Sequence, residues 1–499
     1  MRGTALAALE GKSIHVVGAS GAEGAALLLY LAGHRQIGGI VGHDFSSDFR
    51  AFSRSFRKAN LAWDKEERES TLRTLRRLPI EFRLGSDYLE GVEKADFILA
   101  SQNWFNYPNN LPALPDAVAG GATILGLVDI ALDLFPGTRL GVTGSNGKST
   151  SAGLISHLLG ASLGNDRRFF QGGNDRERQV GLVDLETAKA GDLLLWEVSN
   201  RHLRDRTVPV DIAVLTNITR NHIEDHGSWP AYIAAKLRLP QEALRQGGHA
   251  IVCGSDPVTS EHLSALRPLG GSLWVVGSEQ GDTPGIGAAW VGSSGTLHVR
   301  APGQSEVLNL GHREDLRLQG EHNLTNLLSA LCACLAAGAQ ADDLRGAIRT
   351  FAGLSGRLES VGEANGVRWV YDIQATTAPA AAAGIHALAP DATQLLLIVG
   401  GEDKGMDYSG MANAAAGAAA RVLALPGSGT DAFLDALRDR CAVDHFEDLD
   451  QTIDFAASQA GSGDVVLLSP GCAFFHRNFI EPGQPFARRV SRVIDSRAD

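Results

Sequence analysis

The feature that most constrains the fold is a glycine-rich segment, residues 141–150, placed between an apolar run and a helix-like run. It reads Gly-Val-Thr-Gly-Ser-Asn-Gly-Lys-Ser-Thr, directly follows the strand pattern of residues 139–143 and precedes the helical pattern of residues 151–159. Glycines let a backbone turn its N–H groups toward phosphate oxygens, and the N-terminus of the next helix attracts the same anion. Lys148 would neutralise the β- and γ-phosphates, and the Ser149 hydroxyl would bind Mg²⁺. The usual phosphate loop has its first glycine at position 142, where this chain has valine, so a purely structural turn is the alternative.

Short apolar runs alternate with helical patterns along all 499 residues, and this alternation favours parallel sheets covered by helices. The sequence predicts an α/β protein with a Rossmann-like N-terminal domain (1–137), a central P-loop-type mononucleotide-binding domain (138–353) and a C-terminal Rossmann-like domain (354–499). Residues 271–310 are rich in glycine, valine and serine, which suggests short antiparallel strands. The expected strands are residues 13–18, 39–44, 95–101, 139–143, 192–197, 212–216, 367–371, 395–400, 421–425 and 465–469.

Charge and cysteine usage exclude several classes of protein. The net charge of -12 argues against a chain whose main partner is nucleic acid. The five cysteines lack zinc spacing, and Cys332 and Cys334 lie in an apolar helical run that predicts buried thiols. The N-terminus has no signal-peptide pattern, and residues 324–337 are too few to span a bilayer. We therefore expect a cytoplasmic monomer with no nucleic-acid or membrane partner.

The loop and a series of later motifs together resemble the Mur ligase family over nearly the whole chain. Residues 143–150 resemble its ATP loop, and each further motif is weak alone but falls in the family's order. These motifs are Gly172-Gly-Asn174, Trp196-Glu-Val-Ser199, Thr216-Asn-Ile-Thr-Arg-Asn-His222, Tyr232-Ile-Ala-Ala-Lys236, Gly320-Glu-His-Asn323, Gly353-Leu-Ser-Gly-Arg357, Val370-Tyr-Asp372, Gly400-Gly-Glu-Asp-Lys404 and Leu468-Ser-Pro-Gly-Cys472.

The resemblance implies an ATP-dependent amide-bond ligase that works through an acyl-phosphate, with two Mg²⁺ sites. The expected ATP contacts in the loop are Gly144, Ser145, Asn146, Gly147, Lys148, Ser149 and Thr150. It also implies that Asn323 contacts adenine, that Arg357 clamps the γ-phosphate and that Asp372 binds the ribose, so ATP would bridge the second and third domains. From the residues alone, Asn323 is a helix N-cap.

Three residues are expected at the metal ions. Glu197 ends a buried-looking strand, where it could hold Mg²⁺ with Ser149 or be a solvated acid. His222 follows another strand and could be a metal ligand, a phosphate donor or a structural histidine. By composition, Lys236 is an ordinary surface lysine on a helix over residues 231–239. Only the resemblance implies that it is carbamylated and binds the second Mg²⁺.

The first domain carries its own candidate nucleotide site. Asp44 lies about twenty residues beyond Gly24, where a dinucleotide fold places a ribose-binding acid, so a dehydrogenase reading of this segment alone is open. By resemblance to the glutamate-adding members, Gly18, Ser20, Asp44 and Asn174 contact a uridine diphosphate. Residues 45–84 form a stretch rich in arginine and lysine that could cover the nucleotide or be a solvated hairpin.

The residues around the incoming amino acid depart from the family pattern. Gln374 stands where the family has lysine, and Phe474 replaces a serine that holds a glutamate carboxylate; Lys404 and Phe479 remain as expected contacts. The resemblance implies glutamate addition to UDP-N-acetylmuramoyl-alanine in peptidoglycan synthesis, with either D- or L-glutamate or another acidic residue. The alternatives are an amide ligase acting on another carboxylate, and a nucleotide-binding subunit without ligase activity.

Overall fold

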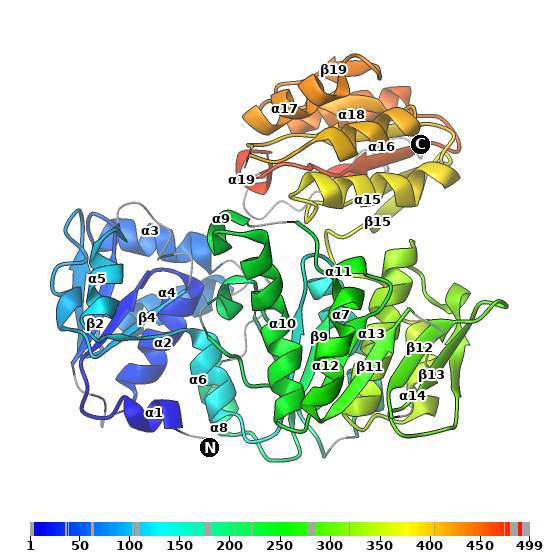
Figure 1. The fold of residues 1–499 in the computed structure, drawn as a ribbon. Helices are drawn as coiled ribbons and strands as arrows, with labels where there is room; N and C mark the ends of the chain where they lie inside the picture. The colour runs from blue at the N-terminus through cyan, green and yellow to red at the C-terminus, as the bar shows by residue number, and fades with distance from the viewer. Residues whose placement is uncertain are drawn as a thin grey trace. The chain divides into compact units, whose positions relative to one another are not determined.

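A computed structural model of the chain describes residues 4–34, 37, 39–60, 64–101, 104, 110–164, 166–173, 181–204, 206–220, 223–277, 285–318, 320–403, 405–473, 475–479 and 488–491. These residues form three β-sheets with helices packed against them (Figure 1). The chain divides into two compact units: Met1–Arg313 with Thr325–Ile348, and Glu314–Leu324 with Arg349–Asp499. The first unit contains two of the sheets and the second contains one, so the predicted α/β class is confirmed.

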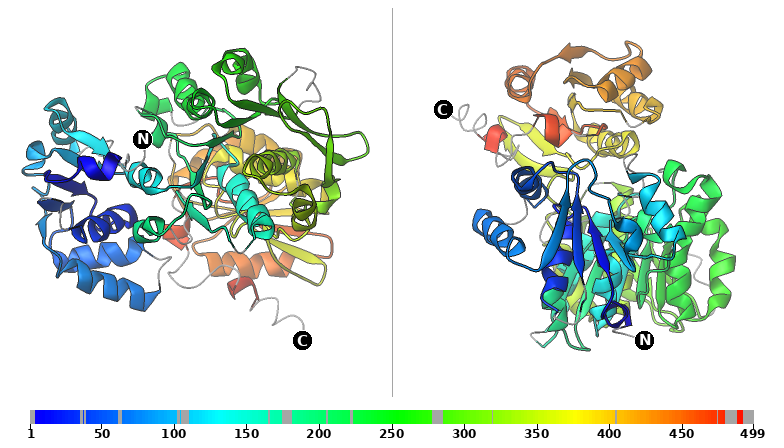
Figure 2. Two further views of the ribbon diagram at one scale, coloured as in Figure 1. Left: turned by 90° about the horizontal axis from the view of Figure 1, so that it is seen from below. Right: turned by 90° about the vertical axis from the view of Figure 1, so that its left-hand side faces the viewer.

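The first sheet has the strand order β3-β2-β1-β4-β5, and every neighbouring pair is parallel. Figure 2 (right) shows these strands running side by side. One face is covered by α2 (Ala22–Ala32), α3 (Phe49–Ala59) and α4 (Lys65–Leu75), because their apolar side chains share one buried core. The strands are β1 Ile14–Val17, β2 Ile40–Asp44, β3 Ile80–Leu84, β4 Phe97–Ala100 and β5 Thr123–Leu125, and α5 (Ala113–Ala119) contributes to a separate core.

The basic stretch of residues 45–84 is not a solvated hairpin. It folds into α3, α4 and β3, and β3 extends the sheet by pairing with β2. The apolar residues Phe52, Phe56, Leu72 and Leu75 are buried, whereas the arginines lie on the outer faces of helices whose N-caps are Asp48 and Asp64. The alternative of a solvated hairpin is therefore wrong, because the charged residues of this stretch belong to a two-helix crossover with a buried apolar face. Whether the stretch covers the nucleotide stays a prediction.

The central sheet is built around β6, with the strand order β14-β13-β12-β11-β10-β9-β6-β8-β7 among the described residues. All neighbouring pairs from β7 to β12 are parallel, whereas β13 pairs antiparallel with both β12 and β14. The prediction of antiparallel strands over residues 271–310 is therefore confirmed for β12, β13 and β14, and it is wrong for the pairing of β11 with β12, which is parallel. The strands are β6 Thr138–Thr143, β7 Phe169–Gly172, β8 Leu193–Glu197, β9 Ile212–Leu215, β10 His249–Cys253, β11 Ser272–Val276, β12 Gly287–Val291, β13 Thr296–Arg300 and β14 Leu308–His312.

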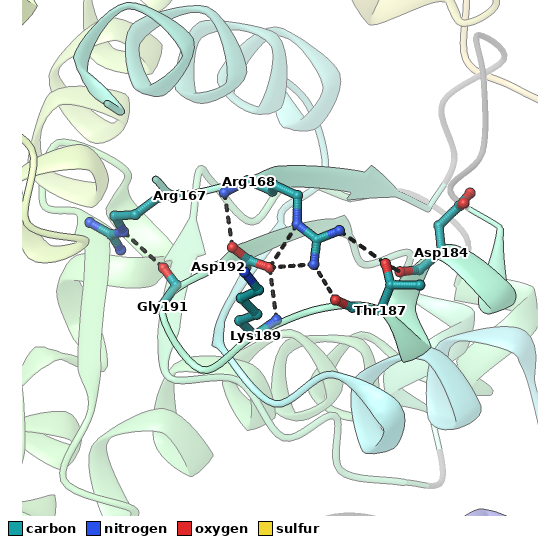
Figure 3. A network of polar contacts seen from close by, with 7 residues as sticks. All are labelled: Arg167, Arg168, Asp184, Thr187, Lys189, Gly191 and Asp192. Carbon is teal, nitrogen blue, oxygen red and sulfur yellow. Dashed lines mark hydrogen bonds and ion pairs between the residues drawn. The ribbon is translucent and has the colours of Figure 1, made fainter. Parts of the chain in front are cut away.

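An arginine–aspartate network ties β7 to β8 at the start of both strands (Figure 3). The side chain of Asp192 is almost fully buried and accepts hydrogen bonds from the backbone N–H groups of Arg168 and Lys189, at 2.9 and 2.8 Å. The Arg168 guanidinium binds the same carboxylate and reaches Thr187. These contacts satisfy a buried charge at the opposite end of β8 from Glu197, so we assign the network to the fold.

The helices of the first unit include three that bear on the site. Helix α7 (Lys148–Ser162) starts directly after the glycine-rich loop. Helix α10 (Trp229–Arg245) packs against β9 and β10 and runs through Pro240, so it is longer than the predicted helix over residues 231–239. Helix α13 (Glu321–Ala336) begins two residues before Asn323, so the prediction that Asn323 is the N-cap is wrong. The remaining helices are α1 Thr4–Ala8, α6 Leu127–Leu134, α8 Leu182–Glu186, α9 Ile223–His226, α11 Pro257–Glu261, α12 Leu263–Leu266 and α14 Ala341–Ile348.

The third sheet has the strand order β15-β16-β20-β17-β18-β19. Its strands are parallel except for β15, which pairs antiparallel with β16. Two separate apolar cores show that helices cover both of its faces. Its elements are β15 Glu359–Ala364, β16 Val367–Tyr371, β17 Leu395–Val399, β18 Arg421–Ala424, β19 Val443–His445, β20 Val465–Leu468, α15 Ala378–Leu388, α16 Ser409–Gly417, α17 Ser428–Leu437, α18 Leu449–Gln459 and α19 Phe475–Phe479.

Two predictions about buried and apolar segments can be compared with the structure. Cys332 and Cys334 are free thiols buried within α13, as predicted. Within the described part of the chain, no helix combines the length and the apolar character needed to cross a bilayer.

Candidate active site

The glycine-rich loop joins β6 to α7 and has the backbone geometry of a phosphate cradle. Gly144 and Gly147 have φ angles of +153° and +78°, which side-chain-bearing residues rarely adopt. A Cβ at Gly144 would lie 1.9 Å from Thr216 Oγ1, and one at Gly147 would lie 2.6 Å from Asn326 Oδ1. Glycine is therefore required at both positions, for space as well as for backbone conformation.

The loop lies where the strand order of the central sheet changes direction. The strands on either side of β6 are β8 and β9, so the segments that follow them flank the loop. Ligands of open α/β sheets bind in the crevice at such a switch point. On the β9 side, Thr216 Oγ1 donates to the Asn146 carbonyl at 2.5 Å, and Asn217 Oδ1 accepts from the Asn146 N–H at 2.9 Å.

On the β8 side, Glu197 meets the first turn of α7. Ser149 Oγ donates to Glu197 Oε2 at 2.8 Å, and Glu197 is buried. The alternative of a solvated strand-end acid is therefore wrong, because the carboxylate faces the loop instead of bulk water. Two hard oxygen donors side by side next to a phosphate cradle fit Mg²⁺, which usually takes one or two protein oxygens and completes its shell with water and phosphate. Thr150 follows in the same turn of α7.

Lys148 folds back over the loop. Its Nζ donates to the carbonyl oxygens of Gly144 and Ser145, at 3.0 and 2.9 Å. The ammonium therefore lies against the loop that the sequence predicts as the phosphate site. A lysine held there can exchange carbonyl partners for phosphate oxygens, which carry more negative charge.

Lys236 is the largest departure from what composition predicts. Its side chain is 1% exposed, so the interpretation as a surface lysine is wrong. Nζ donates to Thr143 Oγ1 at 3.1 Å, and Thr143 Oγ1 in turn donates to the Val198 carbonyl at 2.8 Å. Burial, with the positive charge of Lys148 as a second cause, holds the pKa of Lys236 well below its usual range, while Glu197 acts in the opposite direction. The site therefore favours a neutral amine at this position.

Tyr232, which the sequence motif includes without assigning it a role, connects Lys236 to the loop. It lies one helical turn before Lys236 on α10, and Lys236 Nζ is 5.6 Å from the centre of its ring. The Tyr232 hydroxyl is 2.9 Å from Ser145 Oγ. The i, i+4 spacing from Lys236 was the available signal, because it places both side chains on one face of a helix.

The carboxyl ends of the first sheet hold three of the four residues predicted for a uridine diphosphate, namely Gly18, Ser20 and Asp44. Asp44 is fully buried, and its carboxylate accepts from the Ser20 N–H at 2.9 Å and from Ser46 Oγ at 2.6 Å. Gly18 has a φ of +82°, and the Trp104 indole lies so close that a Cβ there would be 2.2 Å from Nε1. Asp44 thus holds the turn after β1, and its predicted role toward a ribose stays a prediction.

Glu23 is a further acid at this edge, in the first turn of α2. Burial, together with the nearby charge of Asp129, raises the pKa of Glu23 to about 7. Asp129 itself accepts from the Gly126 N–H at 2.6 Å and forms an ion pair with Arg206. This cluster lies where the first and central sheets share one apolar core.

The second unit brings together two of the predicted ATP contacts. Asp372 is buried, accepts from the Leu358 N–H at 3.2 Å and from Ser469 Oγ at 2.9 Å, and has its pKa raised to about 7, mainly by burial. The positive charge of Arg357 opposes that rise, so the two side chains are within electrostatic reach. Phe479, in α19, packs its ring against Phe475 with the ring centres 5.0 Å apart.

Asn323 lies in the first turn of α13 and is buried. Its backbone N–H donates to the Gly320 carbonyl at 3.0 Å. Its predicted contact with adenine stays a prediction. Three further predicted site residues, Asn174, His222 and Lys404, lie outside the described residues.

A cradle of backbone N–H groups, an adjacent serine–glutamate pair and a buried amine at the carboxyl edge of a parallel sheet define a nucleotide-binding α/β enzyme. Comparison with known proteins makes the class specific. The family model described as Mur ligase middle domain matches residues 142–334, and the one described as Mur ligase, glutamate ligase domain, matches residues 356–472. The chain belongs to the Mur ligase family, as its motifs predicted, and is a ligase.

The relatives are similar over most of their length. The chain is 31% identical over 428 residues to the UDP-N-acetylmuramoylalanine--D-glutamate ligase of Symbiobacterium thermophilum, covering 84% of this chain and 89% of the relative. It is 32% identical over 443 residues to the ligase of the same name from Roseiflexus sp., covering 85% and 90%. Among solved structures, the UDP-N-acetylmuramate-alanine ligase MurC of Thermotoga maritima matches with a TM-score of 0.58 at 15% identity, covering 97% of this chain and 99% of that one. At this low sequence identity, the similarity to the Thermotoga maritima structure is evidence for the fold alone.

Proposed function

We propose that this ligase joins glutamate to UDP-N-acetylmuramoyl-L-alanine in the cytoplasm, at the expense of ATP, during peptidoglycan assembly. The observation that carries the proposal is the grouping of Lys148, Ser149 and Glu197 at the carboxyl ends of β6 and β8. The buried Lys236 amine lies nearby, hydrogen-bonded to Thr143 at the end of β6. The named activity of the relatives supplies the substrates.

The reaction needs an activated carboxyl group. The terminal alanine carboxylate attacks the γ-phosphorus of ATP, the bond to the β-phosphate oxygen breaks, and an acyl-phosphate and ADP result. The amine of glutamate then attacks the acyl carbon, inorganic phosphate leaves, and the amine gives up a proton as the amide forms. Lys148 and Arg357 would neutralise the negative charge that accumulates on the transferred phosphoryl group.

Mg²⁺ would be held by Ser149 and Glu197, with His222 and a carbamylated Lys236 as the further protein ligands, and would neutralise phosphate charge when bound. The Lys236 environment fits carbamylation: a neutral amine attacks CO₂ to give a carbamate and a proton, and burial lowers the pKa of Lys236 and so favours the neutral amine. A carbamate oxygen is then a hard ligand for the cation.

Substrate contacts follow the same scheme. Gly18, Ser20, Asp44 and Asn174 would bind the uridine diphosphate at the first sheet, and Lys404 and Phe479 the amino acid. Asn323 would contact adenine and Asp372 the ribose. We propose that residues 1–137 form the domain that binds the uridine diphosphate and that residues 138–353 form the central ATP-binding domain. Residues 354–499 would form the domain that completes the ATP site and binds the amino acid, in a monomeric enzyme.

A substrate panel tests the proposal. The purified chain, MgATP and UDP-N-acetylmuramoyl-L-alanine should release phosphate when D- or L-glutamate is added, and the product should be an amide of glutamate by mass spectrometry. Phosphate release with other carboxylates, but with neither glutamate, would overturn the substrate assignment. Binding of ATP without turnover on any acceptor would overturn the activity.

A further inference from the structure

The Ser145 hydroxyl takes part in three hydrogen bonds, and together they determine which atom donates in each. Ser145 Oγ donates to the Thr219 carbonyl at 3.0 Å and accepts from the Thr219 N–H at 2.8 Å. A hydroxyl has one proton and two lone pairs. Since a carbonyl can only accept, the proton of Ser145 is used there, and Tyr232 must donate its own proton to Ser145 at 2.9 Å.

The same Tyr232 ring borders the lysine amine. Tyr232 is 1% exposed, and its ring also stacks against Trp229, with ring centres 5.8 Å apart and an interplanar angle of 18°. The ring is therefore held in place from the side of Trp229 while Lys236 Nζ lies 5.6 Å from its centre. One side chain thus bonds to the glycine-rich loop through its hydroxyl and places its ring below the lysine amine.

We propose that Tyr232 is a positioning residue that holds the ATP loop and the Lys236 side chain in fixed positions relative to each other. Its hydroxyl anchors the loop through Ser145, and its ring limits the positions that the Lys236 side chain can take. The inference rests on the proposed ATP site and adds to it a residue that acts through two others. A loop held in its binding geometry before the nucleotide arrives loses less entropy on binding, so nucleotide affinity should depend on this anchor.

Tyr232→Phe removes the anchor and keeps the ring. We expect the Kd for MgADP, measured by titration calorimetry, to rise about five- to tenfold, the change that one buried hydrogen bond confers. The kcat at saturating ATP should stay within about threefold, because loss of uniform binding leaves the bound-state chemistry unchanged. Tyr232→Leu removes the ring as well, and we expect kcat to fall in addition.

A double-mutant cycle separates this role from a general effect on folding. Ser145→Ala removes the acceptor, so adding Tyr232→Phe to Ser145→Ala should cost much less affinity than Tyr232→Phe alone. Tyr88→Phe is the matched control, because Tyr88 is also a buried tyrosine whose hydroxyl is hydrogen-bonded, in this case to Asn110. The Kd of the Tyr88→Phe protein for MgADP should equal that of the unaltered protein.

The outcomes are distinct. Additive effects of the two substitutions, or an unchanged Kd in Tyr232→Phe, would overturn the inference while leaving the proposed function in place. Failure of the unaltered protein to bind MgADP would overturn both. A lower melting temperature with unchanged Kd in Tyr232→Phe would assign the residue to stability alone and also overturn the inference.

Discussion

The acid at the edge of the first sheet gives a stability prediction with a defined sign. Glu23 has its pKa raised from its ordinary value of 4.5 to about 7, by burial and by Asp129. Below pH 4.5 the side chain is protonated in both the folded and the unfolded chain, and it costs no stability. As the pH rises from 4.5 to 7 the unfolded chain loses the proton while the folded chain retains it, so the free energy of unfolding falls, and it levels off above pH 7.

The size of the effect follows from the same values. The difference between the pKa of Glu23 in the unfolded chain and in the folded chain corresponds to about 3 kcal/mol of unfolding free energy at full burial, since each pKa unit is worth about 1.4 kcal/mol. Glu23 keeps some exposure to solvent, which screens part of the penalty, so we expect about 1–3 kcal/mol for Glu23→Gln at pH 8 and nearly none at pH 4.5. For a unit of about 340 residues this is a rise in Tm of roughly 1–4 °C at pH 8.

Differential scanning calorimetry at pH 5, 6, 7 and 8 measures this directly. The control is Glu66→Gln, the same change at an exposed glutamate in the first turn of α4. We expect the gain of Glu23→Gln to grow with pH and that of the control to stay flat. A gain that is equal at pH 5 and pH 8, or a loss at pH 8, would refute the assignment of a buried carboxyl that resists ionisation.

Three further substitutions test the catalytic site. Lys148→Ala should lower phosphate release by at least about 100-fold, because phosphate charge is no longer neutralised; undiminished release would refute the role of the loop. Lys236→Ala should lose activity that formate or acetate partly restores by replacing the carbamate oxygen as ligand, and an unaffected rate would mean that the lysine has no such role. Asp372 has a pKa near 7, so the affinity of the unaltered chain for ATP should fall from pH 8 to pH 6 as the carboxyl is protonated, whereas Asp372→Asn should bind weakly and independently of pH; a pH dependence retained in Asp372→Asn would refute this.

Local sequence was enough to predict ten of the strands and the glycine-rich loop, because both depend on neighbouring residues, whereas strands such as β3 and β10 were not predicted. A run such as Leu193–Glu197 is apolar because parallel strands are buried on both faces, and each such run appears in the structure as a strand. The direction of a strand within its sheet is harder to predict from local sequence. Residues 272–276 and 287–291 look like hairpin strands, but β11 and β12 pair in parallel, since their direction is set by the crossover and not by composition.

The candidate site was only partly predictable for a related reason. Ser149 and Glu197 follow from a loop and a strand end, and they meet at 2.8 Å. The contact between Tyr232 and Ser145 joins residues 87 positions apart, and the contact between Asn326 and Ser151 joins residues 175 apart. Such pairs depend on how helices dock on the sheet, which no local pattern encodes.

Lys236 illustrates where local rules fail and why the failure is informative. A lysine on a helix belongs at the surface, because burying an ammonium costs several kcal/mol unless it is paired or neutral. Here the helix turns this residue inward beside Thr143. Burial, and after it the positive charge of Lys148, lowers the pKa of Lys236, so the neutral amine is the favoured form. A fold gains nothing in stability from that arrangement compared with an apolar residue of similar volume. A buried, neutral amine within reach of a phosphate loop is, however, what reaction with CO₂ requires, so the same contact that weakens the fold argues that the site was selected for chemistry.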